Sequence, residues 1–575
     1  MVNIKINNRE VSVPEGTTIL NAAKENGITI PNLCYHPDQE IKANCRVCVV
    51  EVEGAKTLQA SCATEVREGM VIRTNTKKVR QARKVIIELL LANHDLNCIA
   101  CKRNTKCSLQ DIAASIGVRE SPFTNVLIKQ EIDTSSSSIE RNPNKCIRCG
   151  RCIQMCSQVQ SLAILDYIGR SDSVNVKPAF GMYLNNVMCV ACGQCSAVCP
   201  VAAITEKEDI ESVWEAINDP SKTVVVQTAP AVRVSLGEEF GLEPGSIITG
   251  KLVASLRELG FDKVFDTNFA ADLTIIEEGN ELLKRVKEGG VLPMLTSCSP
   301  GWINFIEQYY PELLPHLSSC KSPQQMFGAL AKDYYAKKIG KKAEEIFSVS
   351  IMPCTAKKFE AKREEMRQDG INYDVDVVLT TRELGKMLRQ AGIDFNLLDE
   401  DEYDAPFGIS TGAGAIFGAT GGVMEAALRT VYEVVTGKTL ENLDFRAVRG
   451  LEGIKEAEVD LDGMKVKVAV AHSLSNARKV MELIKSGQAD YTFIEVMCCP
   501  GGCIGGGGQP IGGTNELRLK RMNAIYQADL GLPLRKSHEN PAVNELYRDF
   551  LIEPLGEKSH HLLHTTYKDR KQRFS

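Results

Sequence analysis

Twenty-one cysteines constrain this chain of 575 residues more than any other feature, because fifteen of them lie before residue 200 in closely spaced runs. Thiols only two or three residues apart are typical of metal sites, whereas disulfides belong to oxidising compartments. The N-terminus has no basic and then apolar signal region, and no segment approaches eighteen uninterrupted apolar residues. We therefore expect a cytoplasmic protein that binds metal and does not enter a membrane.

Length and composition indicate a globular protein of several domains. Apolar residues make up 43% of the chain, 25% are charged and the formal net charge is -5, so nucleic acid is not an expected partner. One hydrophobic core rarely supports a chain this long. The predicted domains are residues 1–78, 79–125, 139–209 and 210–555, with a basic tail at 556–575 that has no core of its own and a linker at 133–138.

The first cysteine group has the spacing C-x10-C-x2-C-x13-C and consists of Cys34, Cys45, Cys48 and Cys62. Two ligands from one tight loop and two from farther away can close a thiolate shell around a small cluster. A zinc site is the alternative, although structural zinc prefers two separated C-x2-C pairs. With the strand-like sequence before it, this group resembles a plant-type 2Fe2S ferredoxin domain of the β-grasp type.

The second group has the spacing H-x3-C-x2-C-x5-C and consists of His94, Cys98, Cys101 and Cys107. A neutral imidazole in place of one thiolate should raise the reduction potential of a 4Fe4S cluster. A zinc site with three cysteines and one histidine has the same ligands and stays open as an alternative. The position of the group, between a 2Fe2S-like and a ferredoxin-like module, resembles the order in hydrogenases and complex I.

The third module repeats the run C-x2-C-x2-C-x3-C, at Cys146, Cys149, Cys152 and Cys156 and again at Cys189, Cys192, Cys195 and Cys199. This repeat matches bacterial two-cluster ferredoxins, in which the fourth cysteine of each run ligates the other cluster. Cys156 is therefore expected to join the second run and Cys199 the first. Four clusters in sequence would serve stepwise electron transfer between the surface and a buried site.

After residue 200 short apolar strands alternate with amphipathic helices. The pattern predicts strands at residues 223–226, 263–265 and 291–295, and helices at 250–259 and 272–288. Such alternation is typical of an α/β domain with a largely parallel sheet, here one large or two lobed domains with reactive groups in the loops after the strands. The expected fold class is thus multidomain, α+β in the cluster modules and α/β in the large domain.

The last six cysteines are Cys298, Cys320, Cys354, Cys498, Cys499 and Cys503. The segments 295–302, 352–360 and 495–510 resemble the three signature segments of FeFe-hydrogenases, and with the N-terminal modules the likeness covers nearly the whole chain. In that family these segments hold the H-cluster, a 4Fe4S cubane joined through one cysteine to a diiron unit that carries CO, cyanide and an azadithiolate bridge. The resemblance makes Cys354, Cys499 and Cys503 cubane ligands, and Cys503 also the bridge.

The resemblance also assigns the lining of the diiron unit. Lys357 would donate a hydrogen bond to cyanide, although a lysine on a helix is otherwise a solvated residue. Met352 and Met497 would pack against the diiron unit, and without the resemblance they are core methionines. The other matching positions are Ala229, Pro230 and Gln324, whereas Ala231 replaces a serine that contacts cyanide in many members.

The first signature segment departs from the family, which usually has two adjacent cysteines where this chain has Cys298 and then Ser299. The first of the two passes protons and the second ligates the cubane, and a serine alkoxide is a poor iron ligand. Either Cys298 ligates the cubane and the proton shuttle is lost, or another thiol is the fourth ligand. Of the two spare thiols we favour Cys320 over Cys498, since Cys498 adjoins an existing ligand.

A proton relay is the last feature that the resemblance implies, formed by Cys298, Glu278, Ser318 and Glu281 with Arg285 at its outer end. Glu278 and Glu281 lie three residues apart and therefore on one face of a helix. The alternative is a solvated acidic face with an ion pair between Glu281 and Arg285.

No nucleotide-binding motif is present, because the glycines of residues 412–418 have the wrong spacing for a dinucleotide fold and indicate close helix packing instead. The resemblance to multisubunit members implies reversible H2 conversion in an electron-bifurcating complex with flavin/NAD(P)-binding and 2Fe2S subunits. A stand-alone ferredoxin-dependent hydrogenase is the nearest alternative. A non-catalytic relative, either an electron conduit like the large complex I subunit or an iron-sulfur assembly protein, would lack the diiron-lining residues.

Overall fold

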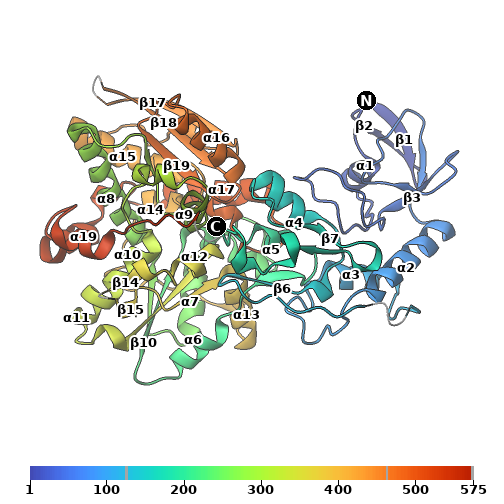
Figure 1. Ribbon diagram of the computed structural model, residues 1–575, viewed down its shortest axis with the longest axis horizontal. Helices are drawn as coiled ribbons and strands as arrows, with labels where there is room; N and C mark the ends of the chain where they lie inside the picture. The colour runs from blue at the N-terminus through green and yellow to red at the C-terminus, as the bar shows by residue number, and fades with distance from the viewer. Residues whose placement is uncertain (124–126, 369, 462–463, 572–575) are drawn as a thin grey trace.

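The computed structural model describes residues 1–123, 127–368, 370–461 and 464–571. Figure 1 shows the N-terminal sheet at one end of the long axis and the large α/β domain at the other. The short helices and strands of the ferredoxin-like segment lie between them. The modules thus follow one another in space in the order in which the sequence predicts them.

The N-terminal module is a five-stranded sheet with one helix, α1 (Ile19–Glu25), packed on it. Its strands run in the order β2-β1-β5-β3-β4, with β1 and β5 parallel. Alternate residues of β1 and β2 point into the core, which explains the period of two in the sequence. The strand bounds are Val2–Ile6, Arg9–Val13, Val49–Val52, Gln59–Ala60 and Val71–Arg73 for β1 to β5.

Two helices lead from this sheet into the ferredoxin-like segment, α2 (Lys77–Ala92) and α3 (Ser108–Ile116). In that segment β6 (Ile139–Arg141) pairs with β9 (Ile204–Glu206), so the first and last strands of the segment lie side by side. The helices α4 (Arg151–Gln154) and α5 (Gln194–Ala197) each carry part of one cysteine run and pack against each other. The outlying hairpin consists of β7 (Asp166–Ile168) and β8 (Asn175–Lys177).

The segment 133–138, predicted as a linker, is packed into this module. Asp133 and Ser138 are fully buried, and Asp133 accepts a hydrogen bond from the backbone N–H of Leu184 at 2.9 Å. The linker prediction was wrong because hydrogen bonds satisfy the polar side chains inside the fold, and composition alone does not show this.

The large domain contains two four-stranded sheets. The first is fully parallel, in the order β11-β10-β13-β16, and the second has the order β12-β19-β18-β17 with only β17 antiparallel. The prediction of a largely parallel sheet is confirmed, and the choice between one large and two lobed domains, which the sequence left open, falls on two separate sheets. The strand predicted at 291–295 is reduced to Met294–Leu295. The bounds are Thr223–Thr228 (β10), Lys263–Asp266 (β11), Met294–Leu295 (β12), Ile346–Met352 (β13), Val377–Thr380 (β16), Ile454–Leu461 (β17), Met464–His472 (β18) and Phe493–Met497 (β19).

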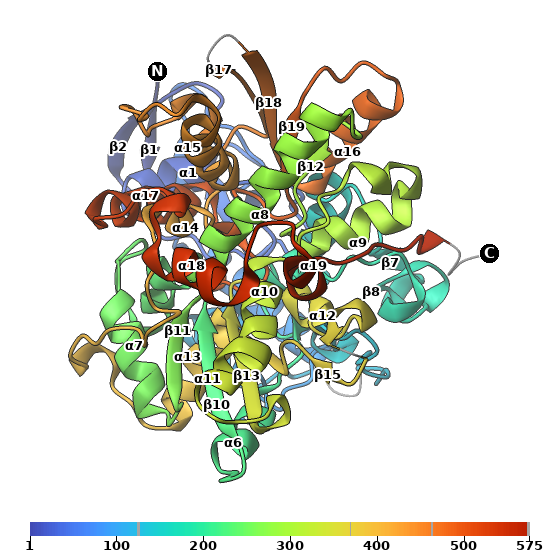
Figure 2. The same cartoon turned by 90° about the vertical axis from the view of Figure 1, so that its left-hand side faces the viewer.

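Long helices fill the space between the two sheets. In Figure 2 the helix α8 crosses the middle of the view, with β17, β18 and β19 above it and β10 and β13 below. The predicted helix near residues 272–288 is this α8 (Thr267–Glu288), and it packs on α10 (Pro323–Leu330), α14 (Gly412–Ile416) and α15 (Gly422–Thr436). The predicted helix at 250–259 is α7 (Thr249–Glu258).

The glycines of residues 412–418 serve close packing, as predicted. A Cβ added at Gly414 would lie 2.6 Å from the carbonyl oxygen of Asn268 in α8. One added at Gly418 would lie 3.0 Å from Ile525 of α17 (Asn515–Gly531). Only glycine allows these helices to approach so closely.

The C-terminal segment wraps over the large domain. Figure 2 shows α18 (Pro541–Leu546) and α19 (Glu557–Leu563) in front of α8 and α10. Leu562 and Leu563 are buried, so the expectation of a basic tail without a core was wrong. The tail is part of the core of the large domain. The prediction failed because the overall basic composition of the tail outweighs its two buried apolar residues in a prediction by composition. None of the helices that the structure describes has the length and apolarity needed to cross a bilayer.

Candidate active site

The first cysteine group comes together under the N-terminal sheet. All four cysteines are buried, the Sγ atoms of Cys48 and Cys62 lie 3.4 Å apart, and Cys34 Sγ accepts from the backbone N–H of Cys45 at 3.5 Å. Four converging thiols in loops are the donor set that a 2Fe2S cluster requires. The residues therefore fit such a cluster.

The second group lies where α2 ends and the loop to α3 begins. His94 is buried, and its Nδ1 has no hydrogen-bond partner among the residues that the structure describes. Burial is also the main reason that the pKa of His94 falls to about 4, so the ring stays neutral. A neutral, buried and unpaired ring nitrogen fits a metal ligand, as the resemblance requires.

The two ferredoxin runs exchange their last cysteines in space. A cavity of about 20 Å³ is lined by Cys146, Cys149 and Cys152 from the first run and by Cys199 from the second. Cys156 lies close to Cys189, Cys192 and Cys195, so that a thiolate at one of these residues would raise the pKa of its neighbours. This arrangement agrees with the exchange expected for two-cluster ferredoxins.

A central cavity of about 70 Å³ lies where strands of both sheets end. Ala229 and Pro230 follow β10, Cys298 follows β12, Cys354 follows β13 and Cys499 follows β19, since reactive loops gather at the carboxyl ends of parallel strands. The predicted residues that line it are Ala229, Pro230, Cys298, Gln324, Met352, Cys354, Lys357, Met497, Cys499 and Cys503. Thr267 and Phe417 also line it and were missed, since neither belongs to a cysteine segment.

The glycine run after Cys503 lets the third segment pack against its neighbours. A Cβ at Gly506 would lie 2.1 Å from the carbonyl oxygen of Pro353, and one at Gly507 would lie 2.2 Å from that of Cys192. These approaches join the second and third segments to the ferredoxin-like module. Three thiols, Cys354, Cys499 and Cys503, thus face one cavity whose walls are held by backbone contacts, which fits a bulky iron-sulfur cofactor.

Lys357 is held at the cavity by a buried carboxylate. Its Nζ donates to Glu360 Oε2 at 2.8 Å and to the carbonyl oxygen of Cys298 at 3.1 Å. Gln324 Nε2 donates to the same Glu360 oxygen at 3.1 Å. The alternative of a solvated lysine was wrong, because only 8% of Lys357 is exposed. Met352 and Met497 face the cavity and also belong to the hydrophobic core, so both of their interpretations apply.

Three of the predicted relay residues, Glu278, Glu281 and Arg285, lie on one face of α8, and Ser318 packs against it. Ser318 Oγ donates to Glu281 Oε2 at 2.9 Å, and Arg285 Nη2 donates to Glu281 Oε1 at 2.6 Å. The acidic face is buried and not solvated, although the expected ion pair of Glu281 and Arg285 does form. Burial, followed by the charge of Glu281, raises the pKa of Glu278 to about 8.

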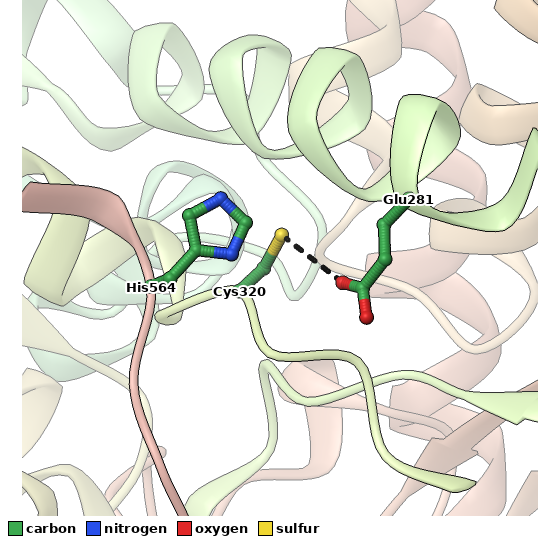
Figure 3. Close-up of side chains that lie close together, drawn as sticks. All are labelled: Glu281, Cys320 and His564. Carbon is green, nitrogen blue, oxygen red and sulfur yellow. Dashed lines mark hydrogen bonds between the residues drawn. The ribbon is translucent and has the colours of Figure 1, made fainter. Parts of the chain in front are cut away.

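Cys320 does not line the central cavity, so its assignment as fourth cubane ligand was wrong. In Figure 3 its thiol points toward Glu281 and His564, and its Sγ lies 3.9 Å from Glu281 Oε2. Its backbone forms a β-bridge with His564, which turns the side chain toward the relay. The sequence shows that Cys320 is available as a ligand, but it does not show on which side of α8 the thiol lies.

Three residues around Glu281 were missed by sequence reasoning. The backbone N–H and hydroxyl of Ser319 both donate to Glu281, and the hydroxyl also meets His564 Nδ1 at 2.8 Å. Tyr567 donates its hydroxyl proton to the carbonyl oxygen of Ser318 at 2.7 Å. Two of the three belong to the C-terminal segment, where the sequence carries no signal that relates them to the relay.

Family profiles match most of the chain. "Iron only hydrogenase large subunit, C-terminal domain" matches residues 222–507, and "Iron hydrogenase small subunit" matches residues 515–570. Three profiles match the cluster modules, a "2Fe-2S iron-sulfur cluster binding domain" at 1–77, an "NADH-ubiquinone oxidoreductase-G iron-sulfur binding region" at 83–122 and a "4Fe-4S dicluster domain" at 145–203.

Known hydrogenases resemble the chain in sequence and structure. The "NADP-reducing hydrogenase subunit HndD" of Solidesulfovibrio fructosivorans is 51% identical over 586 residues, 100% of both chains. "Iron hydrogenase 1" of Clostridium pasteurianum is 42% identical over 99% of this chain and 100% of its own. A solved structure of the FeFe-hydrogenase HydA1 from Chlamydomonas reinhardtii shares 45% identity, covers 62% of this chain and 98% of its own, and has a TM-score of 0.56. The chain therefore belongs to the FeFe-hydrogenase family, as a catalytic subunit that interconverts H2 with protons and electrons.

Proposed function

We propose that this hydrogenase exchanges its electrons with NAD or NADP through flavin/NAD(P)-binding and 2Fe2S subunits of a complex. The observation that carries the proposal is the likeness over the full length of both chains to a subunit of an NADP-reducing hydrogenase. The chain has no nucleotide-binding motif of its own, so a partner must bind the nicotinamide. The N-terminal 2Fe2S-like module is the natural docking surface, since Figure 1 shows it at the end of the long axis opposite the large domain, whose residues form most of the lining of the central cavity.

We assign four accessory clusters to the cysteine groups. The 2Fe2S cluster takes Cys34, Cys45, Cys48 and Cys62, and the first 4Fe4S cluster takes His94, Cys98, Cys101 and Cys107. The two ferredoxin-like 4Fe4S clusters take the exchanged sets, Cys146, Cys149, Cys152 and Cys199 for one and Cys156, Cys189, Cys192 and Cys195 for the other.

The last accessory cluster would lie beside the catalytic cofactor. Cys192, one of its ligands, also lines the central cavity. Thr355, next to Cys354, donates to the carbonyl oxygen of Ala191 at 2.8 Å, and Gln194 donates to that of Gly505 at 2.8 Å. These contacts hold the ferredoxin-like module against the second and third signature segments and keep the distance for electron transfer short.

The central cavity would hold the H-cluster, with Cys354, Cys499 and Cys503 as cubane ligands and Cys503 also next to the diiron unit. When bound, the diiron unit supplies the metal at which H2 is split heterolytically or formed. Lys357 lines this cavity and Glu360 fixes the position of its ammonium, while the apolar side chains of Met352 and Met497 line the same space.

The relay residues would carry the proton between the cavity and the surface. Burial raises the pKa of the Cys298 thiol, so the thiol holds its proton and can pass it on. Glu278 can be the next proton carrier after Cys298, because its pKa lies near neutral pH. Ser318 bonds to Glu281, which meets Arg285 at the outer end.

Infrared spectroscopy and H2 assays on the anaerobically matured protein test this function. We expect CO and cyanide bands that shift under H2, and H2-dependent reduction of NAD or NADP when the partner subunits are added. Activity with reduced ferredoxin alone and none with nicotinamide would favour the stand-alone alternative. A fully matured sample with accessory clusters but without these bands would contradict the assigned cofactor.

A further inference from the structure

The central cavity needs a fourth protein ligand for the cubane. A 4Fe4S cubane has one protein ligand on each iron, and three thiols that line the cavity, Cys354, Cys499 and Cys503, are already assigned. Ser299 also lines the cavity, but a hydroxyl oxygen is a poor ligand for iron beside thiolates. Ser299 therefore stands where the family usually has its fourth cysteine ligand, and it has no thiol to offer.

Cys498 lies at that place. The hydroxyl oxygen of Ser299 accepts a hydrogen bond from the backbone N–H of Cys498 at 3.2 Å, so the two residues adjoin across the end of β12 and β19. Both line the central cavity, together with Cys499. The sequence argument against Cys498, that it adjoins an existing ligand, fails because the loop after β19 presents both thiols to one space.

The wall of the cavity makes room for the Cys498 thiol. A Cβ added at Gly301 would lie only 2.7 Å from Cys498 Sγ. Glycine at 301 therefore allows the thiol to lie over the segment that begins at Ser299. Gln160 Nε2 donates to the carbonyl oxygen of Cys498 at 3.1 Å and holds its backbone from the ferredoxin-like module.

We propose that Cys498 is the fourth cubane ligand in place of Ser299, and that Cys298 remains free as the first proton carrier. The proposal rests on the H-cluster assignment above. On binding, the Sγ–H bond of Cys498 is replaced by an Sγ–Fe bond, and the proton leaves to solvent. Cys192 also lines this cavity, but it is already assigned, with Cys156, Cys189 and Cys195, as a ligand of the neighbouring accessory cluster.

The test measures the cubane itself in the full-length matured chain. Cys498→Ala should lose the iron of one cubane, its EPR signal and the CO and cyanide bands, while the accessory-cluster signals persist and show that the protein is folded. Cys320→Ala is the matched control and should keep the cubane iron. The double variant Ser299→Cys/Cys498→Ala, which moves the thiol across the cavity, should restore the cubane signal.

Retention of cubane iron and EPR signal in Cys498→Ala would overturn the proposal. Loss of the cubane in Cys298→Ala, with retention in Cys498→Ala, would assign the ligand to Cys298 instead. If Cys498→Ala loses all clusters, the double variant decides, because restored signals support the ligand role and their absence contradicts it. Failure of the H-cluster assignment is distinct, since then the unaltered protein itself would lack CO and cyanide bands.

Discussion

At the scale of single residues, burial determines what Glu278 can do. The side chain is 3% exposed, and its Oε1 has no partner among the residues that the structure describes. Burial raises the pKa to about 8, and the nearby charges of Glu281 and Glu495 act in the same direction. The carboxyl therefore changes its charge close to neutral pH, which suits a proton carrier that must serve both directions.

We predict opposite pH dependences for the two directions of the reaction. Below the pKa of about 8 Glu278 is neutral and can donate a proton, and above it the carboxylate can accept one. The rate of H2 production should therefore fall, and that of H2 oxidation rise, as the pH increases through this value. Glu278→Gln cannot ionise and should lower both rates by about 100-fold or more without this pH dependence.

Steady-state rates with artificial electron carriers, compared at equal intensity of the infrared bands, check this prediction. Glu278→Asp is the matched control, because it keeps a carboxyl on the same helix and should keep more of the rate. An unaltered pH profile in the glutamine variant would show that the proton takes another route.

His94 provides a second prediction at this scale. If its unpaired Nδ1 or its Nε2 ligates the second cluster, His94→Cys replaces a neutral ligand with a thiolate and adds one negative charge. The reduction potential should fall by on the order of 100 mV, with unchanged iron content. Redox titration followed by EPR measures it, and an unshifted potential would argue against histidine ligation.

At the scale of elements, the C-terminal segment supports the outer half of the relay. His564 follows α19 and meets Ser319, while the backbone N–H of Thr565 donates to the carbonyl oxygen of Ser319 at 2.8 Å. The buried Leu563 holds α19 in place, and its carbonyl oxygen accepts from the backbone N–H of Lys321 at 2.7 Å. Packing of this helix therefore determines the geometry around Glu281.

Leu563→Ala should loosen this support. Removing a fully buried leucine side chain costs about 2–5 kcal/mol of the free energy of unfolding. We expect a lower thermal midpoint and a lower rate of proton-coupled turnover, with the iron content retained. Glu557→Gln on the exposed face of the same helix is the control and should change stability by less than about 0.5 kcal/mol. Equal stability of both variants would contradict an anchoring role.

At the scale of the whole molecule, a largely buried ion pair joins the ferredoxin-like module to the large domain. Arg382 lies 2.6 Å from Glu206 and donates to the carbonyl oxygen of Gly507 at 2.9 Å. Burial alone would raise the pKa of Glu206, but the Arg382 guanidinium outweighs it and holds this pKa well below its usual range. The pair thus stabilises the folded protein at neutral pH, and its contribution declines as the pH falls below the ordinary carboxyl pKa and is fully lost in strong acid.

Arg382→Met should destabilise this junction by up to about 3 kcal/mol, because it leaves the largely buried Glu206 without its ion-pair partner. We expect slower reduction of the accessory clusters by H2 in stopped-flow absorbance, together with a lower unfolding midpoint. The double variant Arg382→Met/Glu206→Gln also removes the unpaired carboxylate charge and should recover much of the free energy of unfolding. If the single and double variants were equally unstable, the loss would come from packing and not from the charge.

The N-terminal strand, the cysteine modules and the largely parallel sheets were predictable, because spacing and alternation are local properties of the chain. The candidate residues Cys354, Lys357 and Met497 were also identified correctly as lining one site. Glycine spacing at 412–418 predicted close helix packing for the same reason. These signals need no knowledge of which distant segments meet.

Long-range geometry decided the rest. The sequence alone determined that iron-sulfur chemistry and a hydrogenase-like site are present, since the ligand types and their spacing carry that information. Tertiary structure alone decided that Cys320 faces the relay while Cys498 faces the cavity, and that the tail is part of the core. The physical reason is that the direction of a thiol and the burial of a segment depend on contacts between residues hundreds of positions apart.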